Sequence, residues 1–230
     1  MIKIYKKSSY KYLIKKTNNI QKLIKSYKKI YKEIKLLNKK YKFFSISNFS
    51  YIKNQLTKLD LKKKKKNLFL IPIGVKDVFN TKNLKTEFGS SIFKKFIPGN
   101  NSRIVDIITE NQGIIAGKTT TAEFAVHYFP ETSTINPHNK KHITGTSSAG
   151  SAVAVACGAL PVALGTQTAG SIIRPASFCG VIGFKPSFGA LDRTGVLKTS
   201  DTLDTIGLFS SNIFILNKTF QTLIQAEDQY

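Results

Sequence analysis

Apolar residues recur at steps of three and four along the first part of the chain, which is the period of an amphipathic α-helix. The pattern runs from Ile20 to Leu37 and leaves lysines on the opposite face. A weaker version of it predicts a second helix over Tyr51–Leu61. Five consecutive lysines, Lys62–Lys66, come next. Because adjacent like charges repel in any packed setting, these lysines predict a solvated linker.

A different pattern begins after the linker, where short apolar runs of strand length alternate with segments of helical spacing. The expected strands are Leu68–Val75, Gly113–Gly117 and Val162–Gly165. The expected helices are Ile104–Asn111, with Gly113 as its C-cap, Ser151–Ala159, and a helix or turn over Gly170–Phe178. Strands that alternate with helices predict an α/β layered fold with a largely parallel sheet.

Charge divides the chain at the same place. The first 66 residues hold 22 lysines against two acids, whereas residues 67–230 hold 14 basic and 11 acidic residues. We therefore expect a lysine-rich helical region, 1–66, and a core, 67–230. The basic region contains no arginine, the residue preferred for phosphate and base-edge contacts. Solvated helix faces of biased composition are the favoured interpretation, and binding of nucleic acid or an anionic surface is the alternative.

Cys157 and Cys179 lie in small-residue, apolar surroundings and are expected to be buried free thiols, which fits a reducing compartment. No Cys or His spacing resembles a metal site, and neither a metal nor a cofactor is expected. The chain begins without the apolar segment of a signal peptide, and no run approaches the ~18 apolar residues of a membrane span. We expect a cytoplasmic protein, with an organellar matrix as the alternative.

Gly113–Thr119 resembles a phosphate-binding loop but has three residues between its glycines where that loop needs four. Since successive backbone N–H groups must wrap the phosphates, the missing residue removes part of the cradle. The segment is better interpreted as an edge strand that ends in a polar turn.

Two serines in glycine-rich turns and one lysine in an apolar strand carry the strongest chemical signal. Ser147 lies in GTSSAG, Ser171 follows TAG, and Lys76 follows the apolar run IPIGV. A serine hydroxyl is a weak nucleophile until a base accepts its proton, and burial lowers the pKa of a lysine until it can be that base. The next residue, Asp77, should point away because side chains alternate along a strand. Together, the two serines and the lysine predict acyl-transfer catalysis in which the lysine, rather than a histidine, is the base.

Consecutive small residues precede the second serine, in Thr168-Ala169-Gly170-Ser171. Their N–H groups are placed to stabilise a developing oxyanion, and such donors are typically worth ~2.7–4 kcal/mol each. Considered alone, a Gly/Ser turn before a helix more often serves the turn itself. Both serine loops and the strand lysine together favour the catalytic interpretation.

Four segments resemble, in order, the signature of the amidase signature family. They are Gly74–Asp77, the serine- and glycine-rich segment from Gly145, Pro175–Gly180 and Gly183–Pro186. The resemblance covers roughly Ile71–Gly207 and implies an α/β/α sandwich with a mixed, largely parallel central sheet. It also implies amide hydrolysis through a Ser–cis-Ser–Lys triad.

The resemblance assigns a role to each candidate residue. Ser171 is implied to be the nucleophile that forms the acyl-enzyme, and Ser147 the bridging serine that carries a non-proline cis peptide. Lys76 is implied to be the base, and the backbone N–H groups of Thr168 to Ser171 the oxyanion hole. Gln167 stands where the family commonly has aspartate, and Arg174 lies one place later after Ser171 than is usual, a variant that is typical of one branch of general amidases.

We therefore predict an amidase that hydrolyses the C–N bond of a small-molecule carboxamide. An alternative is the A subunit of a tRNA-dependent amidotransferase, which would hydrolyse glutamine with partner subunits. An alternative of another class is an inactive fragment that acts as an interaction module. Family members are usually longer, so we expect a C-terminal truncation, completed by a second copy or a partner chain.

The remaining polar candidates receive structural interpretations. Arg174 is expected to form an ion pair, with a substrate carboxylate as the alternative partner. The other expectations are a pocket-lining or structural role for His127, solvated positions for His138 and His142, and turn or cap roles for Asp201 and Asp204.

Overall fold

The computed structural model describes residues 19–63, 66–126 and 132–225. Its α-helices are α2 (Ile20–Tyr41), α3 (Phe49–Thr57), α4 (Arg103–Glu110), α5 (Ala149–Ala156), α6 (Ile173–Cys179) and α7 (Ile213–Gln225). Its strands are β1 (Phe44–Ile46), β2 (Pro72–Lys76), β3 (Ile114–Thr119), β4 (Val162–Gln167), β5 (Ile182–Phe184) and β6 (Thr205–Ser210). Two 3₁₀ turns are Leu61–Lys63 and Glu123–Ala125.

The strands form one mixed sheet in the order β1-β3-β2-β4-β6-β5. The central strands β3, β2 and β4 are parallel, whereas β1 pairs antiparallel with β3, and β6 pairs antiparallel with both β4 and β5. The mixed sheet confirms the expected fold class. The parallel strands lie at the centre of the sheet. Strand β3 was predicted to be an edge strand, but β1 pairs with its outer side, so β3 lies inside the sheet.

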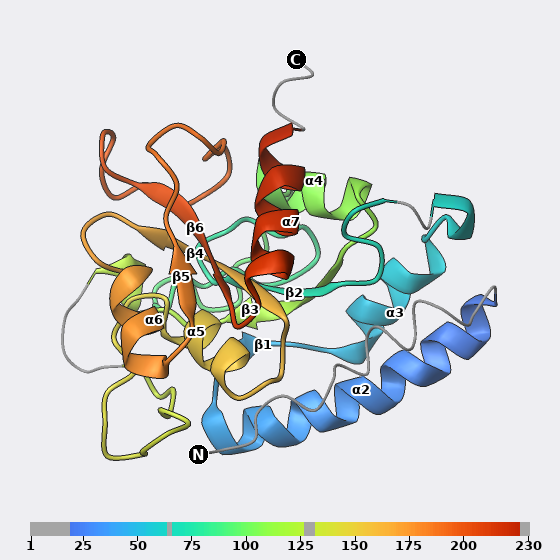
Figure 1. The fold of residues 1–230 in the computed structure, drawn as a ribbon, viewed down its shortest axis with the longest axis horizontal. Coiled ribbons are helices and arrows are strands. Elements are labelled where there is room, and N and C mark those ends of the chain that lie inside the picture. The colour runs from blue at the N-terminus through green and yellow to red at the C-terminus, as the bar shows by residue number, and fades with distance from the viewer. Residues whose placement is uncertain (1–18, 64–65, 127–131, 226–230) are drawn as a thin grey trace.

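Helices cover both faces of the sheet and make three layers (Figure 1). Helices α4 and α7 pack together on one face, and α5 and α6 pack on the other. Successive strand residues alternate between the two faces. Leu208 therefore joins the core under α4 and α7, whereas its neighbour Phe209 joins the core under α5 and α6.

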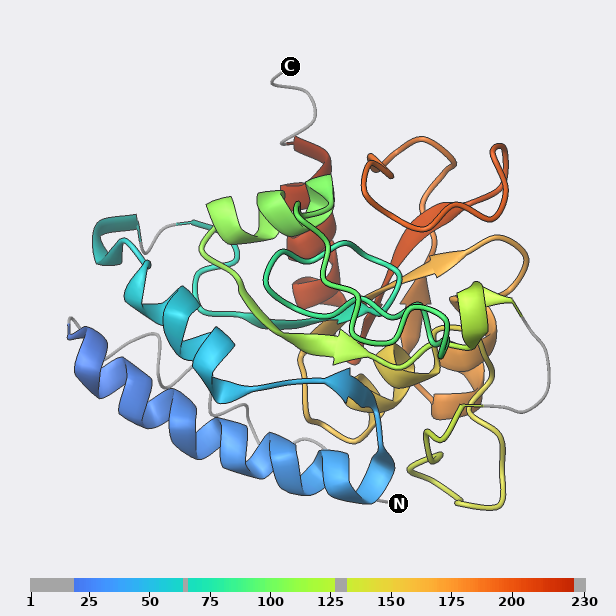
Figure 2. The ribbon, with the colours of Figure 1, turned by 180° about the vertical axis from the view of Figure 1, so that it is seen from behind.

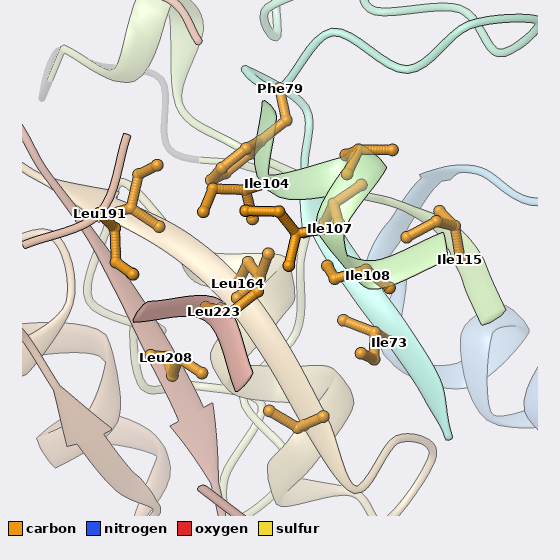
Figure 3. Packing of buried hydrophobic residues seen from close by; sticks show 14 of the residues in the cluster. Ile73, Phe79, Ile104, Ile107, Ile108, Ile115, Leu164, Leu191, Leu208 and Leu223 are labelled. Carbon is orange, nitrogen blue, oxygen red and sulfur yellow. The ribbon is translucent and has the colours of Figure 1, made fainter. Parts of the chain in front are cut away.

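The core between the sheet and α4/α7 is built mainly from aliphatic side chains, with Phe79 among them (Figure 3). Ile104, Ile107 and Ile108 of α4 belong to the same cluster as Ile73 of β2 and Leu208 of β6, and all are fully buried. Burying one such side chain contributes about 1.5–3 kcal/mol. This core fixes the sheet from which the polar site residues project.

The lysine-rich region packs through the apolar stripe that its periodicity predicted. Helix α2 lies along α3 in both views, with Leu23, Ile24 and Tyr27 buried (Figures 1 and 2). The side chains of Asn19 and Asn48 accept hydrogen bonds from backbone N–H groups in the first turns of α2 and α3, which caps both helices. The helices at Ile20–Leu37 and Tyr51–Leu61 are thus confirmed, with bounds shifted by a few residues.

Glycines account for two differences from the sequence expectation. Gly74 does not turn the chain but lies within β2, where a Cβ would approach the Leu160 side chain to 2.7 Å. Helix α4 is capped by Asn111, and the left-handed residue after it is Gln112, not Gly113. Gly113 serves close packing instead, because a Cβ there would lie 2.6 Å from the side chain of Ile108.

The strands β1, β5 and β6 were not predicted. Two of them have only three residues, which is too short for a periodicity. The third, β6, is buried along its whole length, so it has no polar alternation to mark it. None of the described helices combines the length and apolar character that crossing a bilayer requires.

Candidate active site

Lys76 ends β2, and its side chain is fully buried. Its Nζ lies 2.7 Å from the Oγ of Ser147 and 2.9 Å from the Oγ1 of Thr166. Burial lowers the pKa of Lys76 to about 7, although the negative charge of Asp204 opposes that shift. A large fraction of this lysine is therefore neutral near pH 7 and able to accept a proton.

Ser147 is held by the loop that leads into α5. The Thr146–Ser147 peptide bond is cis, as the family resemblance implied, and the Ser147 side chain is fully buried. The guanidinium of Arg174 donates two hydrogen bonds, of 3.0 and 2.9 Å, to the carbonyl oxygen of Thr146. Arg174 thus fixes the carbonyl that precedes Ser147, and it forms no ion pair with the described residues, so the expected ion pair is not found among them.

Ser171 lies in the turn between β4 and α6 and is partly exposed. Two contacts bring this turn against the loop of Ser147. The backbone N–H of Arg174 donates to Gly170 O at 2.9 Å while its side chain binds Thr146, and a Cβ on Gly145 would lie 3.0 Å from Pro175 Cα. The structure therefore brings Lys76 and Ser147 into direct contact and packs the two serine-bearing loops against each other.

Several backbone N–H groups of this turn are not used in hydrogen bonds within the described part of the chain. Within the described part of the chain, the N–H groups of Ala169, Gly170 and Ser171 have no protein acceptor. The N–H groups of Ile172 and Ile173 instead donate to Gln167 Oε1, at 2.8 and 3.0 Å. Three consecutive unpaired donors just before a helix fit the role of an oxyanion hole.

Gln167, at the position where the family commonly has aspartate, therefore has a structural role. Its side-chain oxygen caps the first turn of α6, and a carboxylate could accept the same two hydrogen bonds. The amide retains the cap and removes a negative charge from the neighbourhood of the serines.

A second buried lysine lies on the neighbouring strand β3. Lys118 Nζ lies 3.2 Å from Asp77 Oδ1 and donates to Phe79 O and Thr86 Oγ1, at 2.5 and 2.6 Å. The expectation that Asp77 points away from Lys76 is confirmed. The pair also explains the false phosphate-binding motif, because Lys118 is fully buried in a protein ion pair.

Asp204 is a site residue that the sequence marked only as a turn or cap. It is 6% exposed and accepts hydrogen bonds from the backbone N–H groups of Thr199 and Ser200 and from the hydroxyl of Thr168. The turn role is correct. Nothing in the sequence indicated the contact with Thr168, which lies 36 residues away.

A cavity of about 400 Å³ opens beside these groups. Thr166 and Asp204 line it together with Arg193, Val196 and Ile206. Its volume is in the range of small-molecule sites. The Arg193 side chain is held by the carbonyl oxygens of Ser200 and Asp201, at 3.3 and 3.0 Å.

The other candidates do not join the site. His127 lies outside the described residues, and His142 is exposed. His138 is exposed but pairs with the Cys179 carbonyl at 2.8 Å, so it is not simply solvated. Cys157 and Cys179 are free, and burial raises the pKa of each thiol to about 12. Among the described residues, no group of three His, Cys, Asp or Glu side chains could hold a metal ion.

Known proteins resemble this chain over most of its length. The Amidase family model matches residues 23–229. In Halalkalibacterium halodurans, the A subunit of glutamyl-tRNA(Gln) amidotransferase is 41% identical over 168 residues, which cover 71% of this chain and 35% of that protein. The corresponding protein of Staphylococcus aureus is 39% identical over 150 residues, covering 64% of this chain and 31% of that protein.

Solved structures of related proteins have a similar fold. Allophanate hydrolase of Kluyveromyces lactis matches with a TM-score of 0.83 at 25% identity, over 94% of this chain and 36% of that one. An amidase family protein of Bacillus anthracis matches with a TM-score of 0.79 at 27% identity, over 94% of this chain and 47% of that one. The chain thus spans about a third of the length of its curated relatives. Since the family model covers most of it, the chain belongs to the amidase family.

Proposed function

We propose that this chain hydrolyses a carboxamide C–N bond, with Ser171 as nucleophile, Ser147 as proton bridge and Lys76 as base. One observation carries the proposal: a fully buried lysine with a pKa lowered to about 7 lies 2.7 Å from the serine at the cis peptide. A lysine paired with hydroxyls alone and desolvated is a base that can activate a serine.

The proposed reaction balances its protons within the triad. Neutral Lys76 Nζ takes the proton of Ser147 Oγ, which takes that of Ser171 as Ser171 Oγ bonds to the amide carbon. The tetrahedral intermediate then expels the amine, which leaves with the proton returned from Lys76 through Ser147. Water, deprotonated along the same route, hydrolyses the acyl-enzyme and releases the carboxylic acid.

The turn before Ser171 supports the oxyanion in this proposal. The N–H groups of residues 169–171 have no acceptor within the described chain, so they are available to the substrate oxygen without breaking a protein hydrogen bond. Donors preset in this way are typically worth ~2.7–4 kcal/mol each in the transition state. Thr168 is assigned to the same turn, with its hydroxyl bound to Asp204.

The A subunit of a tRNA-dependent amidotransferase is a second candidate. Its support is the name of the curated relatives at 39–41% identity. In that function glutamine would be the amide, and partner subunits would receive the ammonia. The matched segment is about a third of those relatives, so in that function further chain, or a partner, would complete the pocket for glutamine.

A panel of primary amides, including glutamine, tests the proposal through ammonia release by the chain alone. We expect turnover that Ser171→Ala abolishes. Ser177→Ala is the matched control, because Ser177 is exposed on the same helix α6 and should keep full turnover. Turnover that survives Ser171→Ala would contradict the proposed nucleophile. Turnover of glutamine alone would favour the amidotransferase candidate.

A further inference from the structure

We infer that Asp204 is a positioning residue that fixes the Thr168–Ser171 turn against the loop before β6 and places a fixed negative charge near Lys76. The inference rests on the proposed function of the same site. It adds a residue from outside both serine loops, at the start of a strand that the sequence did not predict.

Strand pairing explains why Asp204 reaches the turn. Strands β4 and β6 are antiparallel, and Gln167 lies opposite Thr205. The residue after Gln167, Thr168, therefore meets the residue before Thr205, which is Asp204. The turn that carries Ser171 begins at this junction.

Four hydrogen-bond donors bind the carboxylate of Asp204. Oδ2 accepts from the backbone N–H groups of Thr199 and Ser200, at 2.6 and 2.9 Å. Oδ1 accepts from the hydroxyl of Thr199 at 2.8 Å and from the hydroxyl of Thr168. Four donors that converge on two oxygens favour an ionised carboxylate, since protonation would turn one of the two oxygens into a donor.

The charge state follows from these contacts. Burial opposes ionisation of Asp204, but the hydrogen bonds from Thr168, Ser200 and Thr199 together hold its pKa below the usual range. The same charge raises the pKa of Lys76 against the larger effect of burial. Lys76 and Asp204 are connected through one chain segment, because Lys76 binds Thr166, which lies two residues before Thr168, and Thr168 binds Asp204.

Other charged groups near Lys76 are already engaged. Helix α5 contributes no titratable side chain, and the guanidinium of Arg174 from α6 is bound to the Thr146 carbonyl. Asp77 and Lys118 pair with each other away from Ser147. In the cavity that Thr166 and Asp204 line, Asp192 accepts from the Thr194 N–H at 2.6 Å and Lys198 pairs with Asp201. Asp204 is the acid that acts on the pKa of Lys76, so its removal should alter the titration of Lys76.

The test measures the rate at which a small alkyl fluorophosphonate labels Ser171, as a function of pH. In Asp204→Asn we expect a lower plateau, because the turn loses a hydrogen bond, and an acid limb displaced to lower pH, because Lys76 loses a charge that favours its protonated form. Asp201→Asn is the matched control, since exposed Asp201 pairs with Lys198 in the same loop and should leave both features unchanged.

A second variant separates the two effects. Thr168→Val keeps the carboxylate but removes its contact with the turn, so the plateau should fall by about tenfold or more, the loss of one hydrogen bond to a charged group, with the limb in place. An unmoved limb in folded Asp204→Asn overturns the inference, as does a Thr168→Val plateau equal to that of the wild type. If the wild type has no acid limb, or Lys76→Met keeps it, the proposed function itself fails.

Discussion

Two buried lysines on neighbouring strands of one sheet have opposite surroundings. Within the described ranges, the hydrogen-bond partners of Lys76 of β2 are two hydroxyl groups, those of Ser147 and Thr166. Lys118 of β3 meets the carboxylate of Asp77, a carbonyl oxygen and a hydroxyl. Both are fully buried. The difference between them is the charge of the partner.

The partner decides what a buried lysine can do. Burial lowers the pKa of Lys76 to about 7 and that of Lys118 to about 8, where the attraction of Asp77 opposes the shift. A lysine bonded to a carboxylate and two further acceptors is stabilised as an ammonium ion, whereas one bonded to hydroxyls has no counter-charge in direct contact. We therefore expect Lys76 to matter for turnover and Lys118 for stability.

The largest expected effect is the loss of turnover in Lys76→Met. General acid–base catalysis contributes about 10²- to 10⁴-fold, so amide turnover should fall by that order, and raising the pH should not fully restore it. Stability should stay close to that of the wild type, because no buried charge is left unpaired. Steady-state ammonia release and urea unfolding measure the two quantities. Wild-type turnover near neutral pH would contradict the proposed base.

Lys118→Met should produce the reverse result. Removing one partner of a buried ion pair leaves the charge of Asp77 without compensation, which typically costs about 3–5 kcal/mol. Burial already raises the pKa of Asp77, so the carboxyl should be driven further toward its neutral form. The midpoint of urea unfolding should fall, while the acid limb of activity, corrected for the folded fraction, stays in place. A displaced limb would mean that the two lysines are coupled.

The double variant Lys118→Met/Asp77→Asn sharpens this comparison. It removes both charges and retains an oxygen that can accept from the Glu87 N–H, which Asp77 binds at 3.3 and 3.4 Å. We expect part of the lost stability to return, by about 1–3 kcal/mol, because no buried charge remains. A double variant that is less stable than Lys118→Met would contradict this expectation, because the bonds of the carboxylate to the Glu87 N–H and the Ser45 side chain would then outweigh the cost of its charge.

The smallest expected effect concerns the cap of α6. Gln167→Ala removes the acceptor of two backbone N–H groups and should cost about 1 kcal/mol, as the loss of a capping residue does. Gln221→Ala on the exposed side of α7 is the control and should be nearly neutral. Equal unfolding midpoints in the two variants would show that the cap contributes nothing.

The sequence predicted the parts of the molecule that depend on local pattern. The stripe of α2, the strand before Lys76 and the turns around Ser147 and Ser171 can each be identified from a short segment. Their periodicity or glycine content reflects a physical requirement of that segment alone. The cis peptide at Ser147 came from the family resemblance.

The remaining features depend on contacts between residues far apart in the sequence, which no local pattern indicates. The contact of Asp204 with Thr168 depends on β6, a strand without polar alternation, which pairs antiparallel with β4. Likewise, the short strand β1 covers β3, so no local signal showed that β3 is internal. The partner of Arg174 is the carbonyl oxygen of Thr146, 28 residues earlier, which no charge pattern can reveal.

The most direct test of the proposed triad is the rate of Ser171 labelling by a small alkyl fluorophosphonate against pH, followed by intact mass. We predict one adduct, absent in Ser171→Ala. We also predict a rate that rises tenfold per pH unit up to about pH 7, where Lys76 loses its proton, and then levels. Lys76→Met should remove this limb, and the folded fraction of Lys118→Met should keep it. An adduct that persists in Ser171→Ala, or a limb that persists in Lys76→Met, would contradict the assignment of Lys76 as the base.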